Sequence, residues 1–300
     1  MTNNTKGMAR YSIRELEKLS GIKAHTIRIW EKRYEIIKPK RTQTNIRYYS
    51  ETDLKKLLNI AILNRQGWKI SEISKLNNDA LSEKVMKFTY NSKDVESQIE
   101  KMVIAIVDLD EAKFDQILSN AIMHDGFEQT IIKLIFPFFE KIGLLWQTGS
   151  INPAQEHFIS NLFRQKLMVA IDNLMIPDKK NAKKFILFLP ENEFHELGLL
   201  FYNYLIKKAG QSVIYLGSSV PFKDVVETNK MIQADYIFTS ITTALTGEKL
   251  EQFIRDLAEA FPEQEIFISG MKIFETDMRL PTNMEKISSP MSFNERLPYL

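Results

Sequence analysis

The fold of the N-terminal region is decided by residues 12–34, SIRELEKLSGIKAHTIRIWEKRY. Ser12 followed three residues later by Glu15 is a capping box, a signature of a helix N-terminus. Apolar residues then recur at helical spacing until Gly21 breaks the pattern, and a second helix is expected to extend to Tyr34. The stretch therefore predicts two helices joined by a short turn.

The next part of the chain extends this pattern. Residues 39–49, PKRTQTNIRYY, are polar and basic and end in aromatic residues, which favours a β-hairpin. Ser50 and Asp53 form another capping box before a helix over 54–63, and a last short helix is expected near 70–76. Together with the first two helices, the hairpin predicts a winged helix-turn-helix.

The charge of the chain is unevenly distributed. The whole sequence has a net charge of +2, whereas residues 1–50 alone hold 12 Lys or Arg against 4 Glu. A basic N-terminal region in an otherwise slightly acidic chain indicates where a polyanion such as DNA would bind. A solvated basic surface is the alternative interpretation, so the charge counts as evidence for DNA only beside the helix-turn-helix pattern.

In a helix-turn-helix, the second helix enters the major groove with exposed polar side chains above an apolar face. Ile27, Trp30 and Tyr34 are expected on that apolar face. Cations of the wing neutralise phosphates and give affinity rather than base recognition. The residues expected to contact double-stranded DNA are Lys23, His25, Thr26, Arg28 and Arg33 of the second helix and Lys40, Arg41 and Arg47 of the wing.

The string I-R-x-W-E-K-R-Y at 27–34, followed by P-x-R at 39–41 and R-Y-Y-S at 47–50, resembles the N-terminal domain of the MerR family. The resemblance covers nearly all of residues 10–77 and implies a DNA-binding domain over 8–78. It further implies a transcription regulator, here taken as a repressor, that binds inverted repeats as a dimer.

Residues 79–94 are polar and weakly periodic, which predicts a linker or a helical dimerisation element. Beyond them, apolar residues recur at helical spacing over four stretches, 95–109, 111–123, 127–145 and 153–174. Four consecutive helices favour a helical bundle, which is expected over 95–176.

From residue 183 to residue 300 the pattern changes to alternating strands and helices. Short apolar strands are expected over 185–189, 212–216, 236–240 and 266–269, with helices over 196–209, 222–233 and 245–260 between them. Repeated βα units predict a doubly wound parallel sheet of the flavodoxin-like kind, with ligands at the carboxyl ends of its strands. Residues 271–300, rich in Pro, Ser and Met, carry no clear pattern.

His195 lies in E-F-H-E-L-G at 193–198, directly after the first of these strands. A neutral imidazole in such a loop binds a transition metal through one ring nitrogen, while a carboxylate holds the other nitrogen. Glu193 is the candidate for that carboxylate. A lone loop histidine is otherwise a solvated surface residue, so the assignment depends on further motifs.

Two motifs supply this context. E-x-H-x-x-G at 193–198 resembles the D-x-H-x-x-G loop of cobalamin-binding domains, in which the histidine ligates cobalt. Upstream, Trp146 precedes Glu156 and His157 in a W-x9-E-H pattern that resembles the helical bundle of light-sensing cobalamin regulators. The resemblance implies that these three residues pack against an upper-face adenosyl group and that His195 holds the metal. The alternative is that Trp146 fills the bundle and that the other two lie on a helix surface.

Later motifs match the cobalamin-binding pattern in part. Ser240-Ile241-Thr242 fits the S-x-L or S-x-T pattern after the third strand, where small residues admit the nucleotide tail of the cofactor. Ser269-Gly270 keeps one glycine of a G-G pair, which weakens the tail pocket without closing it. Gln147 stands where some light-sensing members have a histidine, a change that affects the light mechanism rather than binding. The residues that the resemblance assigns to the cofactor are Trp146, Glu156, His157, Glu193, His195, Gly198, Ser240, Thr242 and Gly270, with His195 as the cobalt ligand.

Composition excludes several classes of function. The chain has no cysteine, which rules out disulfides, thiolate metal sites and cysteine nucleophiles. No run of about 18 apolar residues occurs and residues 1–10 are polar, so a cytoplasmic protein without membrane insertion is expected. No P-loop, G-x-G-x-x-G, H-E-x-x-H or G-x-S-x-G pattern is present, and no enzymatic turnover is expected.

These observations lead to one preferred function and two alternatives. The preferred function is a regulator whose self-association as dimer or tetramer, and hence DNA affinity, responds to adenosylcobalamin or methylcobalamin and to light. One alternative is a MerR-type regulator whose sensor scaffold binds another small molecule or a protein. The other is a corrinoid-carrier module of an enzyme system, against which the DNA-binding head and the lack of a catalytic barrel both count.

Overall fold

The computed structural model describes residues 11–42, 45–65, 67–89, 95–147, 151–175, 181–276 and 278–300. The chain divides into two compact units, Met1–Ile159 and Ser160–Leu300, and each is described by itself. Gln43 and Thr44 of the predicted wing and residues 90–94 of the predicted linker lie outside the described residues.

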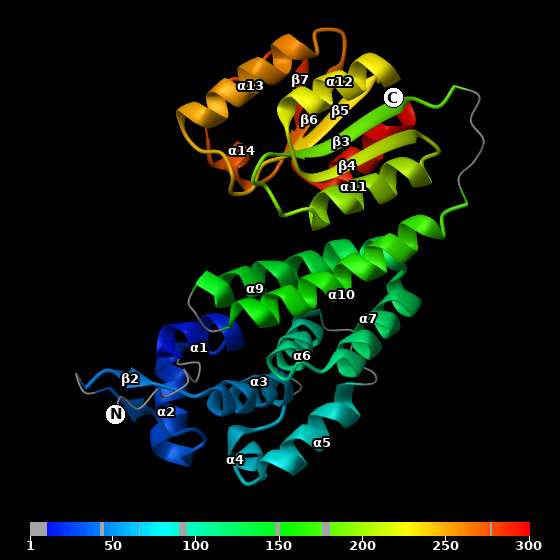
Figure 1. Cartoon of the computed structure of the whole chain (residues 1–300). Helices are drawn as coiled ribbons and strands as arrows, with labels where there is room; N and C mark the ends of the chain where they lie inside the picture. Colours follow the sequence, from blue (N-terminus) through cyan, green and yellow to red (C-terminus); the bar gives the residue numbers. More distant parts are fainter. Residues whose placement is uncertain are drawn as a thin grey trace, which may run out of the picture. The chain divides into compact units, whose positions relative to one another are not determined.

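The N-terminal part of the first unit is the predicted winged helix-turn-helix (Figure 1). Its elements are α1 (Ile13–Ser20), α2 (Ala24–Tyr34), β1 (Lys40–Arg41), β2 (Arg47–Tyr48), α3 (Glu51–Arg65) and α4 (Ile70–Ile73). The predicted capping box forms, since the Ser12 hydroxyl accepts the N–H of Glu15 at 3.3 Å and the Glu15 carboxylate accepts the N–H of Ser12. Gly21 ends α1 with φ 70°, a left-handed conformation that glycine adopts without strain.

The wing is attached to the rest of this domain by two buried tyrosines. Main-chain hydrogen bonds of 2.9 and 2.8 Å join Tyr11, just before α1, to Tyr49, just after β2. The Tyr49 hydroxyl also donates to the carboxylate of Glu31 on α2 at 2.9 Å. The antiparallel pair β1 and β2 is therefore fixed relative to both helices of the motif.

The other elements described in the first unit are helices. They are α5 (Asn78–Thr89), α6 (Val95–Val107), α7 (Glu111–Asp125), α8 (Phe127–Thr130), the π-helical turn η1 (Ile131–Ile135), α9 (Phe136–Gln147) and the beginning of α10 (Pro153–Asp172). Helix α5 occupies most of residues 79–94. Of the two predictions for that stretch, a linker or a helical element, the structure favours the helical element. The third predicted bundle helix contains the π-helical turn, which the sequence did not predict because apolar residues continue through it without a break.

The second unit contains a sheet of five parallel strands in the order β4-β3-β5-β6-β7. The strands are β3 (Lys184–Pro190), β4 (Ser212–Val220), β5 (Tyr236–Ser240), β6 (Glu265–Ser269) and β7 (Met284–Lys286). Besides the rest of α10, the helices are α11 (Leu197–Lys208), α12 (Phe222–Ile232), α13 (Glu248–Ala260), α14 (Met271–Glu275) and α15 (Pro290–Arg296), followed by the 3-10 turn η2 (Leu297–Tyr299). Strand β7 was not predicted, because three residues are too few to show a period.

Helices cover both faces of this sheet (Figure 1). Successive strand residues point to opposite faces, so Ile186 and Ile237 pack with α12 and α13 on one side. On the other side, the Phe238 ring lies 4.4 Å from the ring of Tyr202 on α11 and 5.2 Å from that of Phe293 on α15. Both faces are thus apolar, and polar residues are left for the loops at the strand ends.

The fold class predicted from the sequence is confirmed. It combines a winged helix-turn-helix, a helical bundle and a doubly wound parallel sheet. Within the described residues, no helix is long and apolar enough to cross a membrane.

Candidate functional site

His195 lies at the carboxyl edge of the sheet, in the loop between β3 and α11. Its side chain is 57% exposed, whereas the side chain of Glu193 is completely buried. Nδ1 of His195 lies 2.5 Å from Oε1 of Glu193, and the main-chain N–H of His195 donates to the same oxygen at 3.3 Å. The carboxylate therefore holds the imidazole from its buried side, while the rest of the ring is accessible from outside.

Glu193 also connects the loops that follow β3 and β5. Its Oε2 accepts the main-chain N–H groups of Thr242, Thr243 and Ala244 at 2.8, 2.7 and 3.1 Å. Burial by itself raises the pKa of Glu193, but the hydrogen bonds from His195 and from these three N–H groups outweigh it and lower the pKa to about 2. The carboxylate is therefore ionised at neutral pH and can only accept hydrogen bonds.

The ionised carboxylate fixes the tautomer of the imidazole. Since Glu193 can only accept, Nδ1 of His195 carries the proton, and in the neutral ring Nε2 keeps its lone pair. This is the arrangement in which a histidine ligates a metal through Nε2. Among the described residues, no group of three or more His, Asp or Glu side chains is placed to hold a bare metal ion.

Other residues that the motifs marked come from the loops after β5 and β6. Ser240 and Ser269 are neighbours in the register of these paired strands. Gly270 has φ 99°, and a Cβ atom there would lie 2.6 Å from the main-chain nitrogen of Ile241, so only glycine fits. The loop after β5 is itself bonded to Glu193, and the structure thus brings these residues to one edge of the sheet.

The motif glycine Gly198 lies in the first turn of α11, where a Cβ atom would meet no atom of the described residues within 4 Å. The loop of His195 is held on this side by Glu196, which the sequence did not single out. Its Oε1 pairs with Nε of Arg164 on α10 at 2.8 Å, and its Oε2 accepts the hydroxyl of Tyr215 on β4 at 3.2 Å. Only the chemistry of a carboxylate next to the histidine could have pointed to it.

The predicted upper-face residues lie in the first unit, on α9 and α10. Trp146, near the end of α9, is 55% exposed, so it does not fill the bundle as the alternative interpretation supposed. Glu156 and His157 lie in the first turns of α10, with Nδ1 of the exposed histidine 3.4 Å from the carboxylate. Residues 148–150 and the side chain of Gln147 lie outside the described residues. A role for these side chains toward a cofactor stays a prediction.

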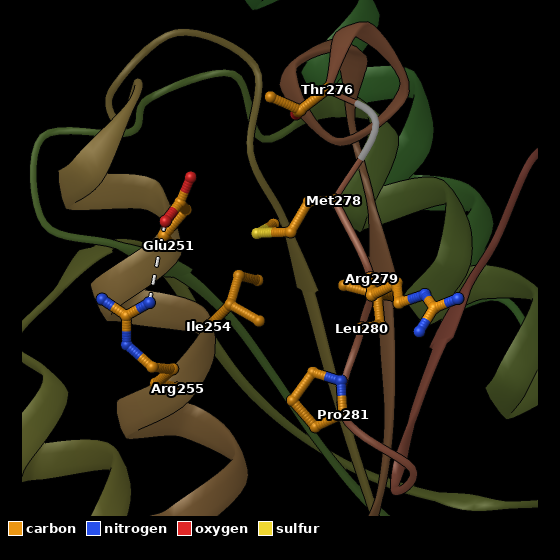
Figure 2. A pocket seen from close by; sticks show the side chains of 8 residues that line it. All are labelled: Glu251, Ile254, Arg255, Thr276, Met278, Arg279, Leu280 and Pro281. Atoms are coloured by element: carbon orange, nitrogen blue, oxygen red, sulfur yellow. Dashed lines mark ion pairs between the residues drawn. The ribbon is translucent and has the colours of Figure 1, made fainter.

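An open hollow of about 630 Å³ lies in the second unit, between α13 and the segment after α14 (Figure 2). On one wall Glu251 pairs with Arg255 at 3.7 Å. Figure 2 shows Arg279 pointing away from this pair. None of the residues that surround His195 lines the hollow. It is therefore not part of the predicted cofactor site.

The predicted DNA contacts lie on α2 and the wing. Ile27 and Trp30 are buried beneath them, as predicted, whereas Tyr34 is only half-buried. The Arg33 guanidinium lies 5.6 Å from the centre of the Tyr34 ring. Exposed side chains are those of Lys23, His25, Arg28, Arg33, Lys40, Arg41 and Arg47, and Thr26 is half-buried. These positions are accessible to a duplex, and their contact with DNA stays a prediction.

Glu17, a residue that sequence reasoning missed, fixes the start of α2. Lys23 is the N-cap of this helix and cannot accept a hydrogen bond. The Glu17 carboxylate instead accepts the N–H of Ala24 at 3.0 Å and pairs with Lys23 at 3.2 Å. These contacts, that from Ala24 first, lower the pKa of Glu17. The negative charge also suits the positive end of the helix dipole.

Comparison with known proteins finds family matches for two stretches of the chain. Residues 11–79 match the MerR HTH family regulatory protein, and residues 98–170 match a B12 binding domain. The HTH-type transcriptional repressor CarH of Myxococcus xanthus is 26% identical over 258 residues, covering 84% of this chain and 85% of the relative. The repressor CarA of the same organism is 23% identical over 261 residues, covering 86% of each.

A solved structure has a similar fold over much of the chain. The monomethylamine corrinoid protein of Methanosarcina barkeri is 17% identical, with a TM-score of 0.52, over 69% of this chain and 100% of that one. At this identity the likeness concerns fold alone. The resemblances that the sequence motifs indicated, to MerR regulators and to cobalamin-binding proteins, are confirmed.

Proposed function

Because this chain combines a MerR-type helix-turn-helix with a B12 binding domain and is homologous to two transcriptional repressors, we propose that it is a cobalamin-responsive, DNA-binding transcription regulator and not an enzyme. The observation that carries the proposal is the pair Glu193 and His195. A buried, ionised carboxylate holds Nδ1 of an exposed imidazole at the carboxyl edge of a parallel sheet, where ligands of doubly wound folds bind.

The side chains at this edge fit a corrinoid. His195 would hold the cobalt through Nε2, and Glu193 would keep the ring in the required tautomer. Ser240, Thr242 and Gly270 have small side chains or none after β5 and β6, which would admit the nucleotide tail of the cofactor. Bound cobalamin supplies a coordinated cobalt whose upper ligand is exchangeable. The remaining residues proposed for the cofactor are Gly198 and, for an upper adenosyl group, Trp146, Glu156 and His157.

The exposed residues of the first unit support a DNA-binding role. We propose that Lys23, His25, Thr26, Arg28 and Arg33 enter the major groove and that Lys40, Arg41 and Arg47 contact phosphates. One such motif covers a short site, so two copies of the chain on an inverted repeat are expected. The proposed domains are residues 8–78 for DNA, 95–176 for the upper face of the cofactor and 183–300 for its lower face.

The finer proposal concerns the form of the cofactor and its effect. Adenosylcobalamin is preferred over methylcobalamin because an exposed indole, with a carboxylate and an imidazole nearby in sequence, suits an adenine and a ribose. Binding in the dark would favour the associated dimer or tetramer and tighten repression, and light would reverse it. A cofactor changes DNA affinity only through its different affinity for the two assemblies.

The experiment measures affinity for the DNA that precedes the coding sequence of this chain, in the dark, with and without adenosylcobalamin. We expect at least a fivefold gain in affinity with the cofactor and its loss on illumination. His195→Ala should remove the gain and leave the affinity without cofactor unchanged. Arg28→Ala and Arg41→Ala should weaken binding in both conditions, and Arg41→Ala should also lower the salt dependence. Equal affinity with and without adenosylcobalamin or methylcobalamin would reject cobalamin control.

A further inference from the structure

Helix α6 is buried almost all round. Ten of its 13 residues are buried, whereas a helix on the surface of a bundle buries one stripe. It packs against α3 of the DNA-binding domain and also against α7, η1 and α9 of the bundle (Figure 1). All of these elements belong to one compact unit. Helix α6 is therefore the layer between the DNA-binding domain and the bundle.

Helix α3 has the same character. Residues 60–63, Ile-Ala-Ile-Leu, are consecutive and all buried, so their side chains point in several directions around the helix. One side of α3 packs with α1 of the helix-turn-helix and another with α6. Any shift of α6 thus acts on the helix that supports the DNA-binding motif.

Charged pairs cross the junction of α3 and α6 at two points. Lys55, near the start of α3, pairs with Asp108, just beyond the end of α6. Arg65, at the end of α3, pairs with Glu100 in the first half of α6. The two helices therefore run antiparallel, and two contacts along their length fix both the translation and the rotation of one helix on the other.

Glu100 is a buried carboxylate with incomplete partners. Its side chain is completely buried, its Oε2 pairs with Arg65, and its Oε1 has no hydrogen-bond partner among the described residues. Such a group costs stability, and apolar side chains would hold two helices together at least as well. What the charged pair adds is one specific register, because the helices must pack so that Arg65 reaches Glu100.

Helix α6 is tied on its bundle side to the helix that carries Trp146. Lys141 of α9 pairs with Glu96 of α6 at 2.8 Å, and the lysine side chain is mostly buried. A displacement of α9 would therefore displace α6, and the pair of Arg65 and Glu100 would pass the displacement to α3. A packed element that two sites can both bias is a physical route for coupling between them.

From this arrangement we propose that α6 transmits the state of the bundle to the DNA-binding domain, and that the Arg65–Glu100 pair fixes the register in which it does so. The inference rests on the proposed function and adds the route of regulation to it. Neither residue belongs to the proposed DNA or cofactor contacts, so a changed affinity ratio on its substitution does not arise from a lost contact with either ligand.

The test uses the full chain and the ratio of DNA affinities with and without adenosylcobalamin in the dark. Glu100→Gln keeps the shape of the side chain and removes its charge, and we expect it to reduce this ratio at least threefold. Arg65→Met should do the same. Glu111→Gln, at an exposed position in the first turn of α7, is the matched control for the loss of a carboxylate charge and should change the ratio less than twofold. Glu96→Gln should also reduce the ratio, because it breaks the pair that ties α6 to α9. A ratio equal to that of the wild type in both Glu100→Gln and Arg65→Met would overturn the proposal.

A second readout does not need cobalamin. Hydrogen exchange should become faster in α3 as well as in α6 when Glu100 is replaced by Gln, whereas Glu96→Gln should affect only α6 and α9. Faster exchange confined to α6 in Glu100→Gln would also overturn the proposal. If wild-type DNA affinity does not respond to cobalamin while exchange in α3 follows Glu100, the proposed function fails and the mechanical junction stands.

Discussion

Glu193 and Glu100 are both completely buried glutamates, yet their pKa values are shifted in opposite directions. The pKa of Glu193 is lowered to about 2, and the pKa of Glu100 is raised to about 7. Burial acts to raise both. Glu193 has three main-chain N–H groups and an imidazole as donors, while Glu100 has Arg65 as its paired donor. For these two carboxylates, the donors around each one decide whether the effect of burial on the pKa is overcome, as at Glu193, or prevails, as at Glu100.

The difference follows from the secondary structure around each residue. At the carboxyl edge of the sheet, the loop after β5 has N–H groups that no helix or strand uses, and three of them converge on Glu193. Around Glu100 the elements are helices, whose N–H groups are bonded to carbonyls one turn earlier. A buried carboxylate there depends on side chains alone. The first carboxylate therefore keeps its charge through main-chain donors, and the second depends on Arg65.

The largest expected effect is that of Glu193→Gln. The Glu193 carboxylate accepts hydrogen bonds through two oxygens, whereas the amide of glutamine has one. The buried N–H groups that lose their partner should lower the free energy of unfolding by about 3 kcal/mol. Trp30, Trp68 and Trp146 all lie in the first unit, so tryptophan fluorescence reports that unit and circular dichroism reports both. The urea concentration at the midpoint of unfolding should therefore fall when circular dichroism is recorded. It should change much less when fluorescence is recorded.

The control for this variant is Glu191→Gln, an exposed position of the same loop. It should leave both unfolding curves in place. A Glu193→Gln protein as stable as the control would contradict the view that this carboxylate organises the edge of the sheet.

A smaller effect is expected for Arg65→Met. Removal of the guanidinium leaves the Glu100 carboxylate buried without its partner, which should lower the stability of the first unit at pH 8 by about 2 kcal/mol. The loss should be smaller at pH 6, because the carboxyl group then takes up a proton. Urea unfolding followed by tryptophan fluorescence measures it, with Lys32→Met at an exposed site of α2 as control. Equal losses at both pH values would show that Glu100 does not titrate in this range.

The smallest effect concerns the pH dependence of the wild type. Burial first, with Glu96 adding to it, raises the pKa of Glu100 against the opposing Arg65 and Lys141. The folded state therefore keeps the proton to higher pH than the unfolded state, so stability falls as pH rises from about 4.5 to 7. Between pH 6 and pH 8 this amounts to about 1 kcal/mol. Glu100→Gln should remove that part of the slope in fluorescence-monitored unfolding, and an unchanged slope would contradict the assignment.

Much of the fold followed from the sequence because its signals are local. Capping residues such as Ser12 and Ser50 marked helix starts, and apolar runs marked four of the five strands. The His195 loop was found by the same means, since a short motif directly after a strand must lie at the carboxyl edge of the sheet. Strand β7 was missed because three residues are too few to show the alternation of a strand. The π-helical turn was missed because it does not interrupt the apolar pattern of its helix.

The partners of the site residues could not be predicted, because they come from distant parts of the chain. Nothing in the spacing shows that the N–H groups of residues 242–244 meet Glu193, or that Glu196 meets Arg164. The contact between Arg65 and Glu100 likewise needed the packing of α3 on α6. A single sequence carries no pattern that shows which distant residues will be in contact.

The most direct test of the central claim is retention of adenosylcobalamin by the purified full chain. The protein is mixed with the cofactor in the dark and passed through a gel-filtration column, and the visible absorbance of the protein peak is recorded. We expect the wild type and Glu191→Gln to keep the corrin absorbance in stoichiometric amount, and His195→Ala to lose most of it or to show a spectrum without histidine ligation. A colourless wild-type peak, or an identical spectrum and retention in His195→Ala, would contradict the claim that His195 holds a corrinoid.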